Sequence, residues 1–570
     1  MVLYFTSLHP GSSNKSWCSC RGCVALLKGV CQPLCNCKFV SCSVHYCLSS
    51  KSGEGNSWRL WYECRSRLVH GVFKLPVSVF AGARNQVQVS CSHTMQQFEV
   101  VDNCLERINK AIADKRTPYC FRPVYIVCKG DNGHYQRPVD SLDKDLSNVD
   151  ICLTSSALSR IRSGCQLLQC LLPELLYAEQ LVDNGDHFGS AIAPGSFRCL
   201  SPEIVTVDLG ADEVRRMQPA MLWARLAQEL AKKFPGDLQS VKWLAFLSCS
   251  RYTRPANHSR RPRSHAELLS CSPGHVNLGA GNLALCGTCG LHFWPTELSG
   301  WQAALGSSDS LPADMMDLSA GQTGILGASL SADLGAVLHE LLHCLGLGHT
   351  RSGVMARGCD LLRLAVAFRQ PDETCAACAR LSRRPAPKPL YWFGQVTFLD
   401  PATAPASSAP ASSASASSAV CYSPDHVSDF RLGPSCAAIL SHHPWLNCHR
   451  LWQTDDNSKI DCDEEGPADR VSISDGHVIS VGSSLCCIEI RSLEPDCLVL
   501  HSLVVSDSTV YRIALSSLPL RRVAPPMATG CYLVAMTRRG LLAKFRLSLN
   551  KFGTQFTASS KRLEAAFSAK

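Results

Sequence analysis

Apolar residues recur at helical spacing in several stretches of the chain. From Leu158 to Gln180 they fall every three or four positions, which predicts one long amphipathic helix that Pro173 could kink or split. Similar spacing from Met217 to Phe234 predicts a helix that ends at a Pro-Gly pair, and the stretch from Val100 to Lys115 predicts another. A further helical pattern begins at Phe430 and ends before the proline at position 444.

Other stretches have the pattern of strands. Residues 123–128 and 241–247 are short apolar runs typical of buried strands, and residues 279–285 lead into a third such segment. Residues 86–90 alternate between polar and apolar side chains, which predicts a half-buried strand, and residues 72–81 predict a strand pair before it. Because strands and helices are mixed along the chain, the sequence predicts an α+β fold.

Changes in composition divide the chain into four predicted parts. Residues 1–55 are rich in Ser and Cys, so we expect a poorly ordered leader, followed by a small β-domain at residues 56–97. The main domain is expected at residues 98–450, with an Ala-, Ser- and Pro-rich insert at 401–420 that is typical of a flexible linker. Residues 451–570 contain many short β patterns, which predict a C-terminal β-sandwich or barrel.

Bulk composition excludes some classes of protein. Hydrophobic residues make up 46% of the chain and charged residues 18%, which is enough apolar material for a core. The formal charge of +9 comes from scattered Lys and Arg without a basic face, so no nucleic-acid partner is expected. No apolar run reaches the ~18 residues of a membrane span, and Met1 to Pro10 lack the pattern of a secretory signal, so we expect a cytoplasmic protein.

Cysteine is abundant, with 33 residues in the chain and a dense cluster between Cys18 and Cys47. In a secreted protein the cluster would indicate disulfides, and in the cytosol its thiolates could bind zinc. Its spacing fits no common zinc module, so a lineage-specific leader is the favoured interpretation. Two C-x-x-C pairs at 286–289 and 375–378 lie far apart in the sequence, and ordinary thiols are favoured over a structural zinc site there.

One motif carries specific chemistry. Residues 339–349 follow the pattern H-E-x-x-H-x-x-G-x-x-H. His339 and His343 are four residues apart and would lie on one face of a helix, where neutral imidazoles can bind one Zn²⁺. Gly346 would let the chain leave the helix in the left-handed conformation and bring back His349 as a third ligand. Three protein ligands leave one coordination position open, as in catalytic zinc sites.

Glu340 follows the first histidine and is placed to act as general base on a water at the metal. Ser331 is expected to cap the N-terminus of this helix, with Asp333 in its first turn. The alternative interpretation of the motif is a buried helix with two hydrogen-bonded histidines. The extended pattern arises by chance far more rarely than a bare H-E-x-x-H, which favours the metal site.

The extended motif followed by Gly353-Val354-Met355 resembles the metzincin signature with its Met-turn. This resemblance implies that Met355 forms a hydrophobic floor beneath the three histidines, although an ordinary core position is the alternative. The chain is also similar to a group of eukaryotic zinc metallopeptidases related to an uncharacterised yeast protein. The stretches that carry this similarity are 160–170, 241–248, 290–295 with its Trp294, and 353–358. The resemblance implies a metzincin-like peptidase domain flanked by the two β-rich parts.

Together these features predict a zinc-dependent metallopeptidase, a hydrolase that cleaves a protein or peptide substrate with Glu340 as general base. The alternative is a non-catalytic protein that holds zinc and acts as a binding module through its C-terminal β-domain. Fungal members of the similar group can end in a jacalin-like lectin domain, so the alternative includes a glycan partner. No clear sugar-binding motif is visible in this part of the sequence.

Overall fold

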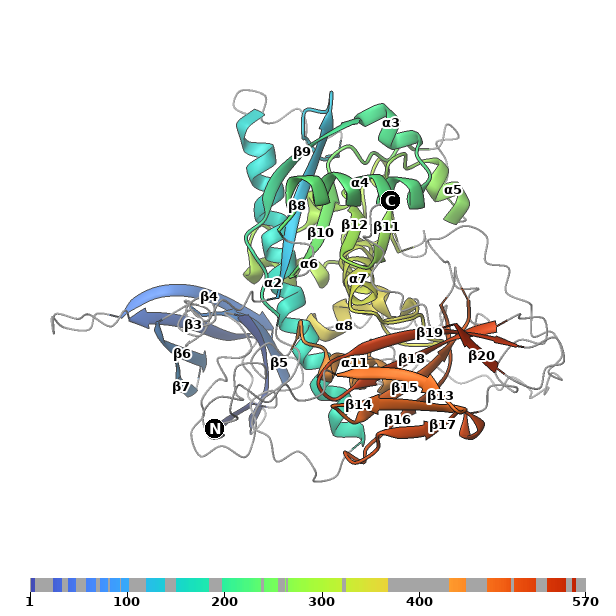
Figure 1. Cartoon of the computed structure of the whole chain (residues 1–570). Helices are drawn as coiled ribbons and strands as arrows, with labels where there is room; N and C mark the ends of the chain where they lie inside the picture. The colour runs from blue at the N-terminus through green and yellow to red at the C-terminus, as the bar shows by residue number, and fades with distance from the viewer. Residues whose placement is uncertain are drawn as a thin grey trace, which may run out of the picture.

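The computed structural model of the chain describes residues 2–5, 24–32, 39–47, 58–67, 72–79, 83–92, 94–101, 119–138, 150–183, 197–236, 240–254, 262, 265–319, 324–367, 430–446, 469–493, 497–518, 530–549 and 556–559. Helices and sheets are both present, which confirms the predicted α+β class (Figure 1). The insert at 401–420, the pair Cys375/Cys378 and the helix predicted beyond residue 101 lie outside the described residues.

The centre of the molecule is a five-stranded sheet with the order β11-β12-β10-β8-β9. Neighbouring strands pair in parallel, except that β11 runs antiparallel to β12 and forms one edge. The middle strand is buried at every position, as the apolar run at 241–247 predicted. The five strands of the central sheet are β8 (Cys120–Lys129), β9 (Glu203–Gly210), β10 (Val241–Leu247), β11 (Asn277–Ala280) and β12 (Leu283–Gly287).

Helices cover both faces of this sheet. Alternate residues of β10 point to opposite faces, so that Leu244 and Phe246 join one hydrophobic cluster while Trp243 and Ala245 join another. The first cluster contains the long helices α2 (Asp150–Asp183) and α7 (Leu326–Cys344), and the second contains α3 (Ala211–Arg216) and α4 (Pro219–Lys233). The predicted helices at 158–180 and 217–234 correspond to α2 and α4, and Pro173 lies inside α2 without splitting it.

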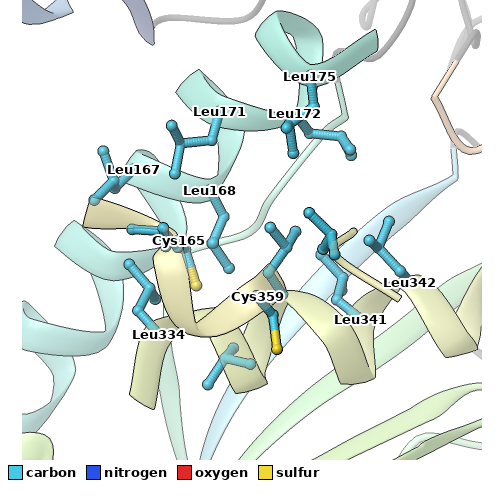
Figure 2. Close-up of a cluster of buried hydrophobic side chains, with 14 of the residues drawn as sticks. Cys165, Leu167, Leu168, Leu171, Leu172, Leu175, Leu334, Leu341, Leu342 and Cys359 are labelled. Carbon is cyan, nitrogen blue, oxygen red and sulfur yellow. The ribbon is translucent and has the colours of Figure 1, made fainter. Parts of the chain in front are cut away.

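The two long helices α2 and α7 pack directly on each other. Figure 2 shows Leu168 and Leu171 of α2 on the side that faces Leu334 and Leu341 of α7, with Cys359 beside them. Shorter helices and 3-10 turns surround this core among the described residues. They are α5 (His265–Ser270), η3 (Leu291–Phe293), η4 (Leu298–Gly300), α6 (Trp301–Leu305), η5 (Arg357–Leu361), α8 (Arg363–Val366) and α11 (Pro434–His442).

Two antiparallel sheets precede the central sheet, with the orders β1-β2-β5 and β4-β3-β6-β7. The leader predicted to be poorly ordered at residues 1–55 contains strands β2 and β3, which pair with strands beyond residue 55. Where a strand pair was predicted at 72–81, the described residues 72–79 contain one strand, and Val100 and Val101 end a strand rather than begin a helix. The strands are β1 (Val2–Phe5), β2 (Val24–Gln32), β3 (Phe39–Cys47), β4 (Arg59–Arg67), β5 (Val72–Ser78), β6 (Arg84–Cys91) and β7 (Thr94–Val101).

The C-terminal part consists of two further antiparallel sheets, with the orders β13-β14-β17 and β16-β15-β18-β19-β20. Side chains from both sheets, such as Val478 and Ile488, share one hydrophobic cluster. Figure 1 shows α7 between the central sheet and these C-terminal strands. The strands are β13 (Arg470–Ser474), β14 (His477–Val481), β15 (Leu485–Arg491), β16 (Val499–Val504), β17 (Arg512–Ala514), β18 (Gly530–Thr537), β19 (Leu542–Leu549) and β20 (Phe556–Ser559), with the 3-10 turn η7 (Leu515–Ser517) after β17.

Cys42 of the N-terminal cluster is a buried free thiol of β3. Cys286 and Cys289 are also buried free thiols, and burial raises the pKa of the Cys289 thiol. Among the described residues, no helix combines the length and the apolar character that crossing a membrane requires.

The packing of α7 on η5 can be tested at Gly335, where a Cβ atom would lie 2.0 Å from the carbonyl oxygen of Cys359. We expect Gly335→Ala to lower the free energy of unfolding by roughly 1–3 kcal/mol, as overpacking does, although Ala is the better helix former by about 1 kcal/mol. Urea unfolding of the full chain measures the change. Gly236→Ala is the matched control, because a Cβ there would meet nothing within 4 Å. Equal free energies of unfolding for the two variants would show that η5 shifts at little cost to make room for the added methyl group.

Candidate metal centre

Helix α7 carries the first part of the motif and begins at Leu326, with Ile325 as its cap, six residues before the predicted cap at Ser331. Ser331 is therefore not the helix cap, and the prediction of its role is wrong. Its hydroxyl lies inside the helix, where it donates to the carbonyl oxygen of Asp360 at 2.7 Å and accepts from the backbone N–H of Arg363 at 2.9 Å. These bonds join the middle of α7 to η5 and α8.

Asp333 is also not in the first turn of the helix. It is buried, and its carboxylate accepts a hydrogen bond of 2.7 Å from the indole N–H of Trp294. Burial raises the pKa of Asp333 to about 7, and the bond from Trp294 opposes this shift. A side chain at Gly290 would collide with the same carboxylate, so the segment before Trp294 approaches α7 closely.

The three histidines of the motif converge on one point. Nε2 of His343 lies 3.0 Å from Nε2 of His339 and 3.1 Å from Nε2 of His349. His339 and His343 are one turn apart on α7, which places both rings on the same face. His349 returns to them from the loop after the helix. Within the described part of the chain, these three residues form the group of possible metal ligands that comes together within 4.8 Å.

The chain leaves α7 through a turn centred on Gly346, whose φ is +78°. The N–H of Gly346 donates to the carbonyl of His343 at 2.9 Å, and the N–H of Leu347 donates to that of Leu342 at 3.2 Å. This pair of bonds is the Schellman arrangement, which favours glycine at the left-handed position. The turn also brings the carbonyl oxygen of Leu347 to 2.9 Å from Nδ1 of His343.

The hydrogen bonds of the rings set their protonation. Nδ1 of His339 lies 2.8 Å from the carbonyl oxygen of Val354, and His343 makes the corresponding contact with Leu347. Because a carbonyl oxygen only accepts, each Nδ1 carries the proton, and the lone pair of each Nε2 faces the centre of the group. Burial and the adjoining rings lower the pKa of His339 to about 3 and that of His343 well below its usual value. Both rings are therefore uncharged at neutral pH, and each Nε2 can donate its electron pair to a metal ion.

This donor set fits a metal cation. Two lone pairs that face each other at 3.0–3.1 Å repel unless a cation lies between them. Tetrahedral Zn²⁺ with Zn–N bonds of 2.0–2.1 Å would separate two ligand nitrogens by about 3.3 Å. The observed spacing needs only a small adjustment of the rings to reach that value.

Glu340 lies beside the group, fully buried on the side of α7 that faces the edge strand β11. Its Oε2 accepts a hydrogen bond of 2.6 Å from the backbone N–H of Gly279. Burial raises the pKa of Glu340 to about 8, and the bond from Gly279 opposes this shift. A side chain at position 279 would place a Cβ atom 2.0 Å from the carbonyl oxygen of Glu340, so only glycine allows this approach of strand and helix.

Met355 is buried in the same hydrophobic cluster as α7. It belongs to a tight loop after His349, in which the N–H of Thr350 donates to the Met355 carbonyl at 2.9 Å. Gly353 adopts a φ of +85°, and its neighbour Val354 supplies the carbonyl that orients His339. The loop therefore holds one histidine while it buries the methionine.

Sequence reasoning did not identify Gly279, Trp294 or Asp333 as parts of the site. Two sequence features could have pointed to them: Trp294 lies in one of the stretches that are similar to known metallopeptidases, and Gly279 begins a glycine-rich segment. Their contacts with α7 join residues 39 or more positions apart, which no local pattern reveals.

The fold and the site define an α+β protein with three converging histidines that could hold a metal ion. Comparison with known proteins extends this description. Residues 201–427 match a family described as "Putative peptidase family". The matched stretch contains the whole H-E-x-x-H-x-x-G-x-x-H motif. Together with two yeast relatives, this match confirms the predicted resemblance to eukaryotic zinc metallopeptidases.

Two relatives come from yeasts. A protein of Schizosaccharomyces pombe, named "Putative zinc metalloproteinase", is 22% identical over 227 residues, which are 37% of this chain and 34% of the relative. A protein of Saccharomyces cerevisiae with the same description is 36% identical over 91 residues, which are 15% of this chain and 13% of the relative. The chain thus spans about a third or less of the length of these relatives.

The buried carboxyl of Asp333 makes a prediction about stability and pH. Its pKa is about 7 in the folded chain and 3.8 in the unfolded one, so between these values the folded state binds the extra proton. Wild-type stability should therefore fall as pH rises from about 4 to 7, by about 1.4 kcal/mol per pH unit from this group. Asp333→Asn keeps an acceptor for Trp294 but does not titrate.

We expect the stability of Asp333→Asn relative to wild type to increase across this pH range and then level off above pH 7. Urea unfolding at pH 5, 6, 7 and 8 measures the difference between the two proteins. A difference that is independent of pH would mean that Asp333 is ionised in the folded protein throughout.

Proposed function

We propose that the chain is a zinc-dependent metallopeptidase with a metzincin-like active site, in which His339, His343 and His349 bind the metal and Glu340 is the general base. The observation that carries this proposal is the convergence of three histidine Nε2 atoms beside the buried carboxyl group of Glu340. The family match and the names of the yeast relatives support the same class of activity.

Zinc is the proposed metal because of the ligands. Three imidazoles form a borderline-soft donor set that suits zinc better than Mg²⁺ or Ca²⁺, which prefer oxygen ligands. Val354 and Leu347 hold the proton-bearing nitrogens of two rings, as is usual for histidines that bind zinc. Three protein ligands leave a coordination position for water or substrate.

When bound, zinc would supply Lewis acidity, which polarises a peptide carbonyl and lowers the pKa of water. The residues of the chain supply the proton transfers. Glu340 would accept a proton from the attacking water and pass it to the leaving amine. The N–H of Gly279 holds Oε2 of Glu340 in place, which leaves Oε1 for the reacting proton. A cation close by would also stabilise the ionised form of this buried carboxyl.

The proposed substrate is an extended peptide. In the described sheet, β11 is an antiparallel edge strand, and it lies directly against Glu340. Extended peptides can bind by adding a strand to such an edge, with backbone hydrogen bonds that do not depend on side chains. The geometry therefore favours a polypeptide over a compact small molecule.

The proposal predicts a clear separation between metal binding and catalysis. Wild-type chain should contain about one zinc and cleave members of a diverse peptide library. His343→Ala should lose the metal and the activity together. Glu340→Gln should keep the metal, because its amide oxygen can still accept from Gly279, while kcat falls by roughly 10²–10⁴. Metal analysis and library cleavage by mass spectrometry measure these outcomes.

A wild-type chain that binds zinc but cleaves no peptide would favour the non-catalytic alternative. A chain that binds no metal, when folded and supplied with zinc, would contradict both functions.

A further inference from the structure

The loop that carries the third histidine contacts the C-terminal β-rich region. The backbone N–H of Val499, the first residue of β16, donates to the carbonyl oxygen of His349 at 2.7 Å. His349 and Leu498 also form a parallel β-bridge, which aligns the two chain segments side by side. Residues that are 149 positions apart or more are thus joined through the backbone of a proposed metal ligand.

Two glycines of the loop contact the same strands. A Cβ atom at Gly348 would lie 2.5 Å from the carbonyl oxygen of Cys497 and 2.9 Å from Cδ of Arg491. A Cβ atom at Gly346 would lie 2.3 Å from a methyl carbon of Leu542 on β19. The loop therefore has C-terminal residues against it at three successive points.

The C-terminal residues are themselves held firmly. Arg491 is buried, and its Nε donates to the carboxylate of buried Glu489 at 2.8 Å. Ser492 and Leu498 exchange two hydrogen bonds of 2.9 Å, which join the residue after β15 to the residue before β16. Cys497 adopts a φ of +44°, a strained conformation for a residue other than glycine, which persists only where the surroundings determine it.

These contacts matter because His349 is the one proposed ligand outside α7. A helix fixes the relative positions of His339 and His343, but a loop of five residues after the helix does not by itself fix a ring. Groups that orient a ligand from behind typically change metal affinity 10–100-fold when they are removed. The backbone bond to Val499 and the packing of Leu542 are such groups.

We propose that the C-terminal β-rich region positions His349 and is therefore a structural part of the metal centre rather than an appended module. Val499 and Leu542 are the positioning residues, because they contact the loop at His349 and Gly346. The inference rests on the metal binding proposed above. It assigns a role to strands that lie beyond residues 201–427, the stretch that matches the peptidase family.

The hydrogen bond can be tested with two substitutions at one position. Val499→Pro removes the N–H that His349 accepts, and proline is tolerated at the first residue of a strand. Val499→Ala removes side-chain atoms but keeps the N–H, so it is the matched control. We expect Val499→Pro to weaken Co²⁺ binding by the full chain roughly 10–100-fold and to change the visible spectrum of the bound ion, while Val499→Ala stays close to wild type.

The packing contact has its own pair of variants. Leu542→Ala removes the methyl groups next to Gly346, and Leu515→Ala makes the same truncation in the C-terminal cluster away from the loop. We expect Leu542→Ala to weaken Co²⁺ binding and Leu515→Ala to lower only the unfolding temperature. Titration with Co²⁺, competition with zinc and thermal unfolding give these values, and Leu542→Ala remains informative if Val499→Pro does not fold.

The inference is overturned if Val499→Pro and Leu542→Ala bind Co²⁺ as tightly as wild type, or if all four variants weaken it equally. Both results are distinct from failure of the proposed function. A wild type that binds metal with the expected pattern of variants but cleaves no peptide would contradict the peptidase and leave the positioning role intact.

Discussion

The close approach of α7 to the edge of the central sheet is the contact on which the rest of the site depends. At Gly279 the strand comes so near to the helix that no side chain fits between them. This approach lets a backbone N–H of β11 reach the carboxylate of Glu340. It also fixes the distance between the sheet and the helix face on which His339 and His343 lie. A bulkier strand residue would move all three functional groups together.

Helix α7 is unusual in burying several polar side chains, and each of them meets a specific partner. Ser331 bonds to the segment after the motif, Asp333 to Trp294 and His339 to Val354. Burying polar groups is costly unless they are hydrogen-bonded, so the helix is stable in only one rotation about its axis. That constraint is what aims the two imidazoles at a common point.

Features that are encoded locally could be predicted from the sequence. The strands β8 and β10, the helix α4 and the turn at Gly346 follow from apolar spacing and from one glycine. Ser331 was misjudged because its hydroxyl satisfies a distant carbonyl, and capping preference describes only the nearest turn. The strands before residue 55 were missed although Val40, Cys42 and Val44 alternate with serines in β3, because a high content of Ser and Cys is not typical of strands and because these strands pair with distant partners. Contacts such as that of Val499 with His349 have no signature in either segment.

The unbroken course of α2 through Pro173 has a mechanical consequence. A helix of 34 residues is about 51 Å long, and α2 packs against strand β2 of the N-terminal sheet, β8 of the central sheet and helix α11. Through α11, which packs on β15, it also reaches the C-terminal strands. The N-terminal, central and C-terminal sheets thus all contact the same helix, either directly or through α11. Partial unfolding of any of these sheets would expose apolar surface of the same helix to water. The chain should therefore unfold as a single cooperative unit rather than as independent domains.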